Sequence, residues 1–154
     1  MRLTEFIPAT GIIFRLGATD SKGAIDELAE RLATLYGLNT NEVREGLRER
    51  EQLGPTALGN EVAAPHAKMD VPHTVGVLGL SVAGIAFDAP DGAPVRIFVA
   101  FLSPRQGGRH LKALAAVGQE LSDPHARSRL LAATSAQDLY AVLGSPTVPV
   151  SSAR

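Results

Sequence analysis

Residues 95–102, Val-Arg-Ile-Phe-Val-Ala-Phe-Leu, form the most strongly apolar run of the chain. Apolar residues occupy almost every position instead of alternating with polar ones, which predicts a central β-strand buried on both faces. A strand of this kind needs packed layers above and below it. This run therefore favours a layered α/β fold.

Local patterns on both sides of this run supply those layers. Apolar stripes and capping residues predict helices at residues 21–36, 40–50, 110–121, 124–131 and 135–143. Further extended segments are expected at residues 11–16, 62–64 and 75–87. Because helices and strands are interspersed, we predict a single α/β layered domain, with a mixed β-sheet flanked by helices on both faces.

Composition limits the possible functions. The 154 residues are 45% apolar, enough for one independently folding domain, expected at residues 1–144. The tail, residues 145–154, is rich in serine and proline and is expected to be disordered. The net charge is −1 with both signs interspersed, so neither nucleic acid nor an anionic membrane is an expected partner.

The chain also has no cysteine, which excludes thiolate metal sites and cysteine nucleophiles. It has no apolar run of signal-peptide length at the N-terminus and none of the roughly 20 residues needed to span a bilayer. We therefore expect a cytoplasmic protein without direct membrane insertion.

His66 is the residue that most requires an explanation. It follows the short apolar segment 62–64 and Pro65. Proline has no N–H for a sheet and fixes its own φ, so His66 is predicted at a strand exit, aimed by a stiff backbone. A lone histidine there is more often a surface or packing residue, but a rigidly held imidazole also suits nucleophilic or acid–base chemistry.

Two other residues favour a functional role for His66. Arg50 stands at the end of a predicted helix, and His110 opens another helix after Gly107-Gly108. A guanidinium fork and the first turn of a helix both suit phosphate oxygens. Sites in α/β folds collect at the carboxyl ends of strands, where both histidines are expected.

A different class of function, a metal-dependent hydrolase, is also considered. Its candidate ligands are His66, Asp70, His73 and His110. The spacing matches no familiar ligand pair, Pro72 interrupts any helix that could align them, and no His-Glu-x-x-His motif occurs. His73 and His125 are expected at the surface. Lys68 either steers an acidic partner or is simply solvated.

Together these motifs resemble a known family. The resemblance is carried by Arg50-Glu51, Gly54-Pro55-Thr56, Gly59-Asn60, Ala63-Ala64-Pro65-His66 and His110-Leu111 with Leu114. In this order and spacing they resemble the enzyme IIA domains of the bacterial phosphotransferase system, in the fructose, mannitol and nitrogen-regulatory class. The likeness extends from Leu3 to about Gly144.

The resemblance implies a phosphocarrier. His66 matches the phosphorylated histidine, His110 the second active-site histidine and Arg50 the active-site arginine. The implied donor is the small phosphocarrier HPr or its nitrogen-branch counterpart, and no cofactor or metal is implied. This chain departs from many members at Ala64 and at Glu61, where nitrogen-type members often have glycine.

Two roles remain open. In one, phosphorylation of His66 acts as a regulatory signal that changes which partner, such as a kinase or transporter, the protein holds. In the other, the group passes to a separate enzyme IIB for fructose- or mannitol-type uptake. No IIB or membrane IIC module is fused to the chain, which favours the nitrogen-regulatory branch.

Overall fold

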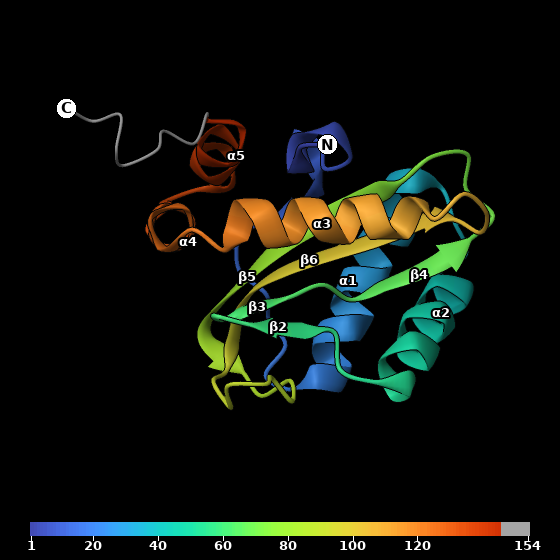
Figure 1. The fold of residues 1–154 in the computed structure, drawn as a ribbon, viewed down its shortest axis with the longest axis horizontal. Helices are drawn as coiled ribbons and strands as arrows, with labels where there is room; N and C mark the ends of the chain where they lie inside the picture. The colour runs from blue at the N-terminus through green and yellow to red at the C-terminus, as the bar shows by residue number, and fades with distance from the viewer. Residues whose placement is uncertain (146–154) are drawn as a thin grey trace.

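A mixed sheet of six strands forms the middle layer of the structure, a computed structural model that describes residues 1–145 (Figure 1). The strands are β1 (Ile12–Ile13), β2 (Ala57–Gly59), β3 (Val62–Ala63), β4 (His66–Met69), β5 (Val75–Ile85) and β6 (Val95–Pro104). Their order is β1-β5-β6-β3-β2, and β4 also pairs with β6. The predicted layered α/β fold with a mixed sheet is confirmed.

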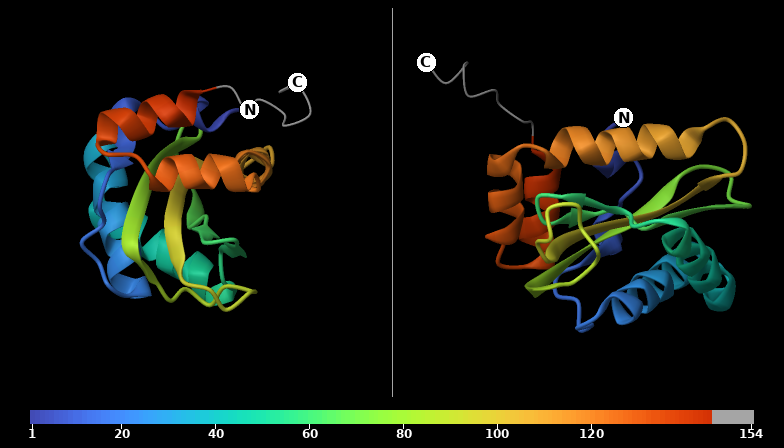
Figure 2. Two further views of the ribbon diagram at one scale, coloured as in Figure 1. Left: turned by 90° about the vertical axis from the view of Figure 1, so that its left-hand side faces the viewer. Right: turned by 60° about the horizontal axis from the view of Figure 1, so that its bottom comes forward.

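Helices cover both faces of the sheet, as predicted. They are α1 (Ser21–Tyr36), α2 (Thr40–Leu53), α3 (Arg109–Leu121), α4 (Pro124–Leu131) and α5 (Ala136–Gly144), with short 3-10 helices η1 (Leu3–Glu5) and η2 (Ala9–Gly11). The right-hand view of Figure 2 shows α1 and α2 on one side of the sheet and α3 and α5 on the other. Two apolar clusters, one per face, fill the spaces between these layers.

Strand β6 is the centre of the sheet. It runs antiparallel to β5 on one side and parallel to β3 and β4 on the other. Phe98 and Phe101 are both completely buried, Phe98 in the cluster beneath α1 and α2 and Phe101 in the cluster beneath α3. The prediction of a central strand buried on both faces is confirmed.

Helix starts follow the local signals in the sequence. The side chains of Asp20, Asn39, Asp123 and Ser135 each accept a hydrogen bond from a backbone N–H in the first turn of α1, α2, α4 and α5. These contacts satisfy N–H groups that have no partner inside the helix. Helix α1 ends at Gly37, whose φ of 68° is accessible to glycine at little cost.

The short strands differ from the prediction. Only Ile12–Ile13 of the expected strand 11–16 is a strand, and β2 and β4 were not predicted at all. Such strands consist of two to four residues, and their hydrogen bonds depend on distant partners instead of on a local pattern. Helix α2 also continues beyond Arg50 to Leu53.

The predicted domain boundary falls at the end of α5. Ser145, the last described residue, has its carbonyl oxygen 3.3 Å from Nη2 of Arg2, which donates a hydrogen bond to it. The rest of the segment predicted to be disordered, residues 146–154, lies outside the described residues. Within residues 1–145, no helix has both the length and the apolarity required to cross a membrane.

Candidate functional site

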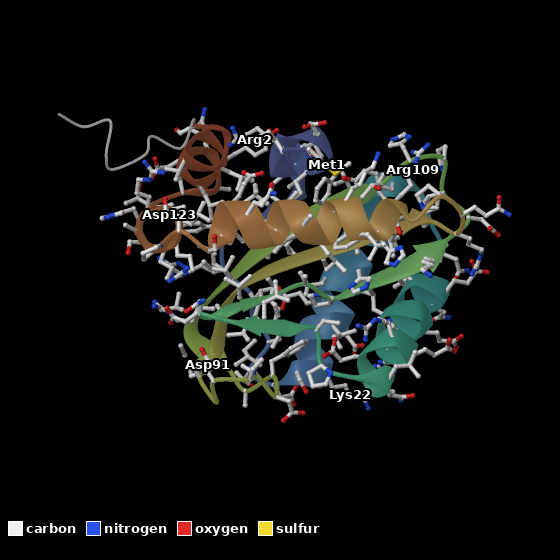
Figure 3. The ribbon with its side chains drawn as sticks, in the orientation of Figure 1. Met1, Arg2, Lys22, Asp91, Arg109 and Asp123 are labelled. Atoms are coloured by element: carbon white, nitrogen blue, oxygen red, sulfur yellow. The ribbon has the colours of Figure 1, made fainter. Side chains whose placement is uncertain are left out.

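Three elements bring Arg50, His66 and His110 to one cleft. Its lining consists of Gly46, Glu49, Arg50, Leu53, His66, Ala67, Lys68 and His110. Arg50 lies in the last turn of α2, His66 on β4 and His110 in the first turn of α3. Figure 3 labels Arg109, which marks the start of α3 above β4 and α2. The three residues predicted from sequence therefore do converge.

The backbone around His66 is an interrupted strand. β3 and β4 pair with β6 one after the other, in parallel, with Ala64 and Pro65 between them. The backbone N–H of Phe101 donates to the carbonyl of Pro65 at 3.0 Å. The prediction that His66 follows the end of a strand was wrong in this respect, because pairing with β6 resumes after the proline and His66 opens β4.

The imidazole of His66 is fixed on two sides and only 5% exposed. Its Nδ1 lies 2.8 Å from the carbonyl oxygen of Ala64. Its ring stacks on that of Phe101, with 5.0 Å between centroids and 9° between planes. A carbonyl oxygen can only accept, so Nδ1 carries the proton and the lone pair of the neutral ring lies on Nε2.

His110 lies beside this ring. The two imidazole centroids are 6.3 Å apart and the planes differ by 16°. Gly108 precedes the helix with a φ of 62°, a left-handed conformation that suits a residue without Cβ. Nδ1 of His110 is enclosed and has no hydrogen-bond partner within residues 1–145. Because His110 lines the cleft, its ring can contact a group bound there.

Arg50 contributes a positioned guanidinium. Its Nη1 donates to the carbonyl oxygen of Gly54 at 2.9 Å, which anchors one arm of the fork against the loop that follows α2. The remaining donors of a guanidinium can serve an anion. Lys68 adds a second positive charge to the lining of the same cleft.

Both histidines are biased toward the neutral form. Burial lowers the pKa of His66 below its usual value, opposed by the hydrogen bond to Ala64 and reinforced by the charges of Arg50, His110 and Lys68. Partial burial likewise lowers the pKa of His110, and Lys68 and Arg50 add to the effect. At neutral pH the cleft thus presents an imidazole nucleophile beside two cations, a combination suited to accepting a phosphoryl group.

The other candidates do not join the cleft. His73 lies on an exposed bend and His125 in the exposed first turn of α4. Asp70 is exposed and forms an ion pair with Arg105, with 3.1 Å between Oδ1 and Nε. In the part of the chain that the structure describes, no three His, Cys, Asp or Glu side chains are grouped so that they could hold a metal ion. The metal-dependent hydrolase thus has no site there.

Sequence analysis missed part of the cleft wall. Leu53 is 86% exposed and extends the wall past Arg50, because α2 is one turn longer than predicted. Gly54, which follows Leu53, was the available signal, since a glycine often marks the end of a helix. Glu49 and Ala67 complete the wall and had no distinguishing pattern.

Comparisons with known proteins agree with this geometry. Residues 5–145 match the family described as phosphoenolpyruvate-dependent sugar phosphotransferase system, EIIA 2. A nitrogen regulatory protein of Bradyrhizobium diazoefficiens is 37% identical over 150 residues, covering 95% of this chain and 97% of that protein.

Solved structures give the same result. The crystal structure of nitrogen regulatory protein IIA-Ntr from Neisseria meningitidis superposes with a TM-score of 0.84 and 31% identity, covering 92% of this chain and 98% of that one. A second solved structure is a complex of enzyme IIA-mannitol with phosphorylated enzyme IIB-mannitol from Escherichia coli. One of its chains superposes with a TM-score of 0.77 and 23% identity, and the match covers 89% of this chain and 96% of that one. The second likeness concerns the fold alone.

Proposed function

Since the chain belongs to the EIIA 2 family of the phosphoenolpyruvate-dependent sugar phosphotransferase system, we propose that it carries a phosphoryl group on Nε2 of His66. The observation that carries this proposal is the hydrogen bond from Nδ1 to the carbonyl of Ala64, at 2.8 Å. It leaves the lone pair on the other nitrogen. The proposed donor is HPr or its nitrogen-branch counterpart, and the proposed setting is the cytoplasm.

The proposed reaction moves one phosphoryl group between two imidazoles. The P–N bond to the donor histidine breaks as a P–N bond to Nε2 of His66 forms, and the donor imidazole leaves with its electron pair. Such transfers have loose transition states, so the protein mainly positions the groups and stabilises charge. Because His66 is neutral at physiological pH, no separate base has to activate it.

Arg50 and His110 are the proposed partners of the bound group. A phosphorylated side chain carries roughly −1.5 to −2 charges, and a guanidinium offers donors that match its oxygens. Both residues line the cleft with His66. Lys68 lines it too, which supports a contribution to attracting the anionic group.

Exposed apolar side chains beside the cleft support docking of a protein donor. Leu53, in the cleft wall, is 86% exposed, and Leu111, which follows His110, is 61% exposed. Large exposed apolar residues next to a charged site are typical of the centre of a protein interface. A phosphocarrier protein that covers both leucines would also exclude water from the transferring group.

For the role of the phosphorylated form, we favour regulation. Relatives at 37% and 31% identity that match more than nine-tenths of the chain bear the name nitrogen regulatory protein. The alternative is transfer to a separate enzyme IIB. That reading rests on the complex of enzyme IIA-mannitol with phosphorylated enzyme IIB-mannitol, whose IIA chain shares this fold.

The test is intact-mass analysis after incubation with phosphoenolpyruvate, enzyme I and an HPr-type donor. We expect an acid-labile, phosphate-sized increment on the wild type and none on His66→Ala. A His66→Ala protein that is still labelled would refute the assignment. Labelled protein is then offered a set of IIB domains of the fructose and mannitol type. Transfer to one of them would support uptake, whereas phosphorylation-dependent binding to a kinase or transporter would support regulation.

A further inference from the structure

A chain of hydrogen bonds links the end of α2 to the ring of His66. Both carboxylate oxygens of Glu51 accept from Thr56, one from its backbone N–H at 2.8 Å and one from its hydroxyl. The carbonyl of Thr56 accepts from the N–H of Ala64 at 3.0 Å. The carbonyl of Ala64 in turn accepts from Nδ1 of His66 at 2.8 Å. Only the last of these contacts involves the imidazole of His66, and it is made at Nδ1 and not at the proposed acceptor nitrogen, Nε2.

Ala64 is the residue through which this series of hydrogen bonds orients the ring of His66. Its N–H donates to the carbonyl of Thr56, and its own carbonyl belongs to the peptide bond with Pro65, whose ring fixes the φ of Pro65 itself. Ala64 is completely buried and Thr56 is 4% exposed, so water does not compete for these bonds. The direction of the Ala64 carbonyl therefore depends on where Thr56 is held.

Glu51 fixes Thr56 from a helix end that also carries Arg50. Residues 54–56 lie between α2 and β2, and the two carboxylate contacts tie Thr56 back to α2. Bonds to an ionised carboxylate are stronger than bonds between neutral groups. The last turn of α2 thus positions the guanidinium of Arg50. Through Glu51, Thr56 and Ala64 it also positions the carbonyl oxygen that orients the imidazole of His66.

We propose that Glu51 and Thr56 are positioning residues that hold His66 in the tautomer with its proton on Nδ1. This inference rests on the proposed function, because that tautomer is the one with a free lone pair on Nε2. If the Ala64 carbonyl moves out of line, the proton can reside on Nε2 instead. A ring in that form has no lone pair at the proposed acceptor position.

The experiment compares Thr56→Val, which removes the hydroxyl at nearly constant volume, and Glu51→Gln with the wild type. Thr56→Ser is the conservative rescue, and Glu45→Gln is the matched control because Glu45 is an exposed acidic residue on the same helix. Nitrogen-15 NMR of the His66 ring measures which nitrogen is protonated. Steady-state transfer from a phosphorylated donor separates kcat from KM.

We expect the Nε2-protonated form to become the major tautomer in Thr56→Val and Glu51→Gln, because the rate follows the fraction of the ring in the accepting form. We expect kcat to fall about fivefold to tenfold in each, the loss typical of one weakened hydrogen bond. KM for the donor should stay within about twofold, because the docking residues are unchanged. Thr56→Ser and Glu45→Gln should match the wild type in tautomer and rate.

Wild-type tautomer populations in both Thr56→Val and Glu51→Gln would overturn the inference, as would a loss confined to KM. Circular dichroism and thermal unfolding are recorded for every variant, and Glu51→Gln tests the same hydrogen bonds if Thr56→Val does not fold. The NMR measurement needs no phosphoryl transfer. If the wild type takes no phosphate, the proposed function fails while the tautomer result still decides the role of Glu51 and Thr56.

Discussion

At the scale of single residues, the environment of His66 predicts a pH dependence. Only the neutral ring can accept, and burial moves the pKa of His66 below the usual value of about 6.5. The ring of His66 should therefore become protonated, and lose its ability to accept a phosphoryl group, at a lower pH than an exposed histidine would. We expect the rate of single-turnover phosphorylation to be flat near pH 7 and to fall with a midpoint below 6.5. An NMR titration of His66 with a midpoint at or above 6.5 would contradict this.

Charge stabilisation predicts a ranking of variants. His110→Ala and Arg50→Lys should each slow transfer by up to about a hundredfold, as for removal of one donor that stabilises transition-state charge, whereas His66→Ala abolishes it. Arg50→Lys keeps the charge but loses the fork that also binds the Gly54 carbonyl. Rapid-quench measurement with labelled donor checks the order. If all three variants lost the same amount of transfer activity, the residue that accepts the phosphoryl group would not be His66.

Sequence patterns could predict that Arg50, His66 and His110 converge, but not how their side chains are held. Arg50 and His110 were predictable because each lies at a helix end marked by local signals. The acceptor for Nδ1 is the backbone carbonyl of Ala64, and a backbone carbonyl has no sequence signature. The ring of Phe101 beneath His66 was hidden for a different reason. Its strand was predicted correctly, but the register that pairs Phe101 with His66 joins residues far apart in the chain.

At the scale of elements, helices were easier to predict than short strands. Asp20 and Asn39 mark helix starts through contacts within one turn. The strand β4 has no such mark, and Pro65 correctly predicted an interruption but not that pairing with β6 would resume after it. Strands β3 and β4, of two and four residues, depend on their pairing with the long strand β6.

The β2–β3 hairpin offers a test at this scale. Asn60 and Glu61 have φ values of 55° and 70°, as in the two-residue turns that favour glycine. Glu61→Gly should raise the free energy of unfolding by about 1 kcal/mol, because a left-handed conformation strains a residue that has a Cβ. The partly exposed Glu61–Arg96 pair, with 3.5 Å between Oε2 and Nη1, contributes little.

Glu61→Ala is the control for that prediction. It removes the same carboxylate but keeps the Cβ at the same φ, so we expect stability within about 0.5 kcal/mol of the wild type. Urea unfolding followed by circular dichroism measures both variants. If Glu61→Ala is as stabilising as Glu61→Gly, the gain comes from losing the charge and the strain explanation is wrong.

At the scale of the whole molecule, the two apolar clusters share the central strands. Leu28 on α1 and Leu139 on α5 are both completely buried, on opposite faces of the sheet. Leu28→Ala and Leu139→Ala should each lower the free energy of unfolding by about 2–5 kcal/mol. Because β5 and β6 belong to both clusters, each variant should still unfold in one transition. A separate early transition in Leu139→Ala, seen by calorimetry, would show that the faces unfold independently.

The aromatic support of His66 reaches back to the first residues of the chain. The ring of Phe6 meets that of Phe101 edge-on, with centroids 5.9 Å apart, and Phe101 supports His66. Gly76 leaves room for Phe6, since a Cβ there would lie 2.8 Å from its ring. A chain without Phe6 would keep Arg50, His66 and His110 yet lose the ring that packs against Phe101, on which His66 stacks.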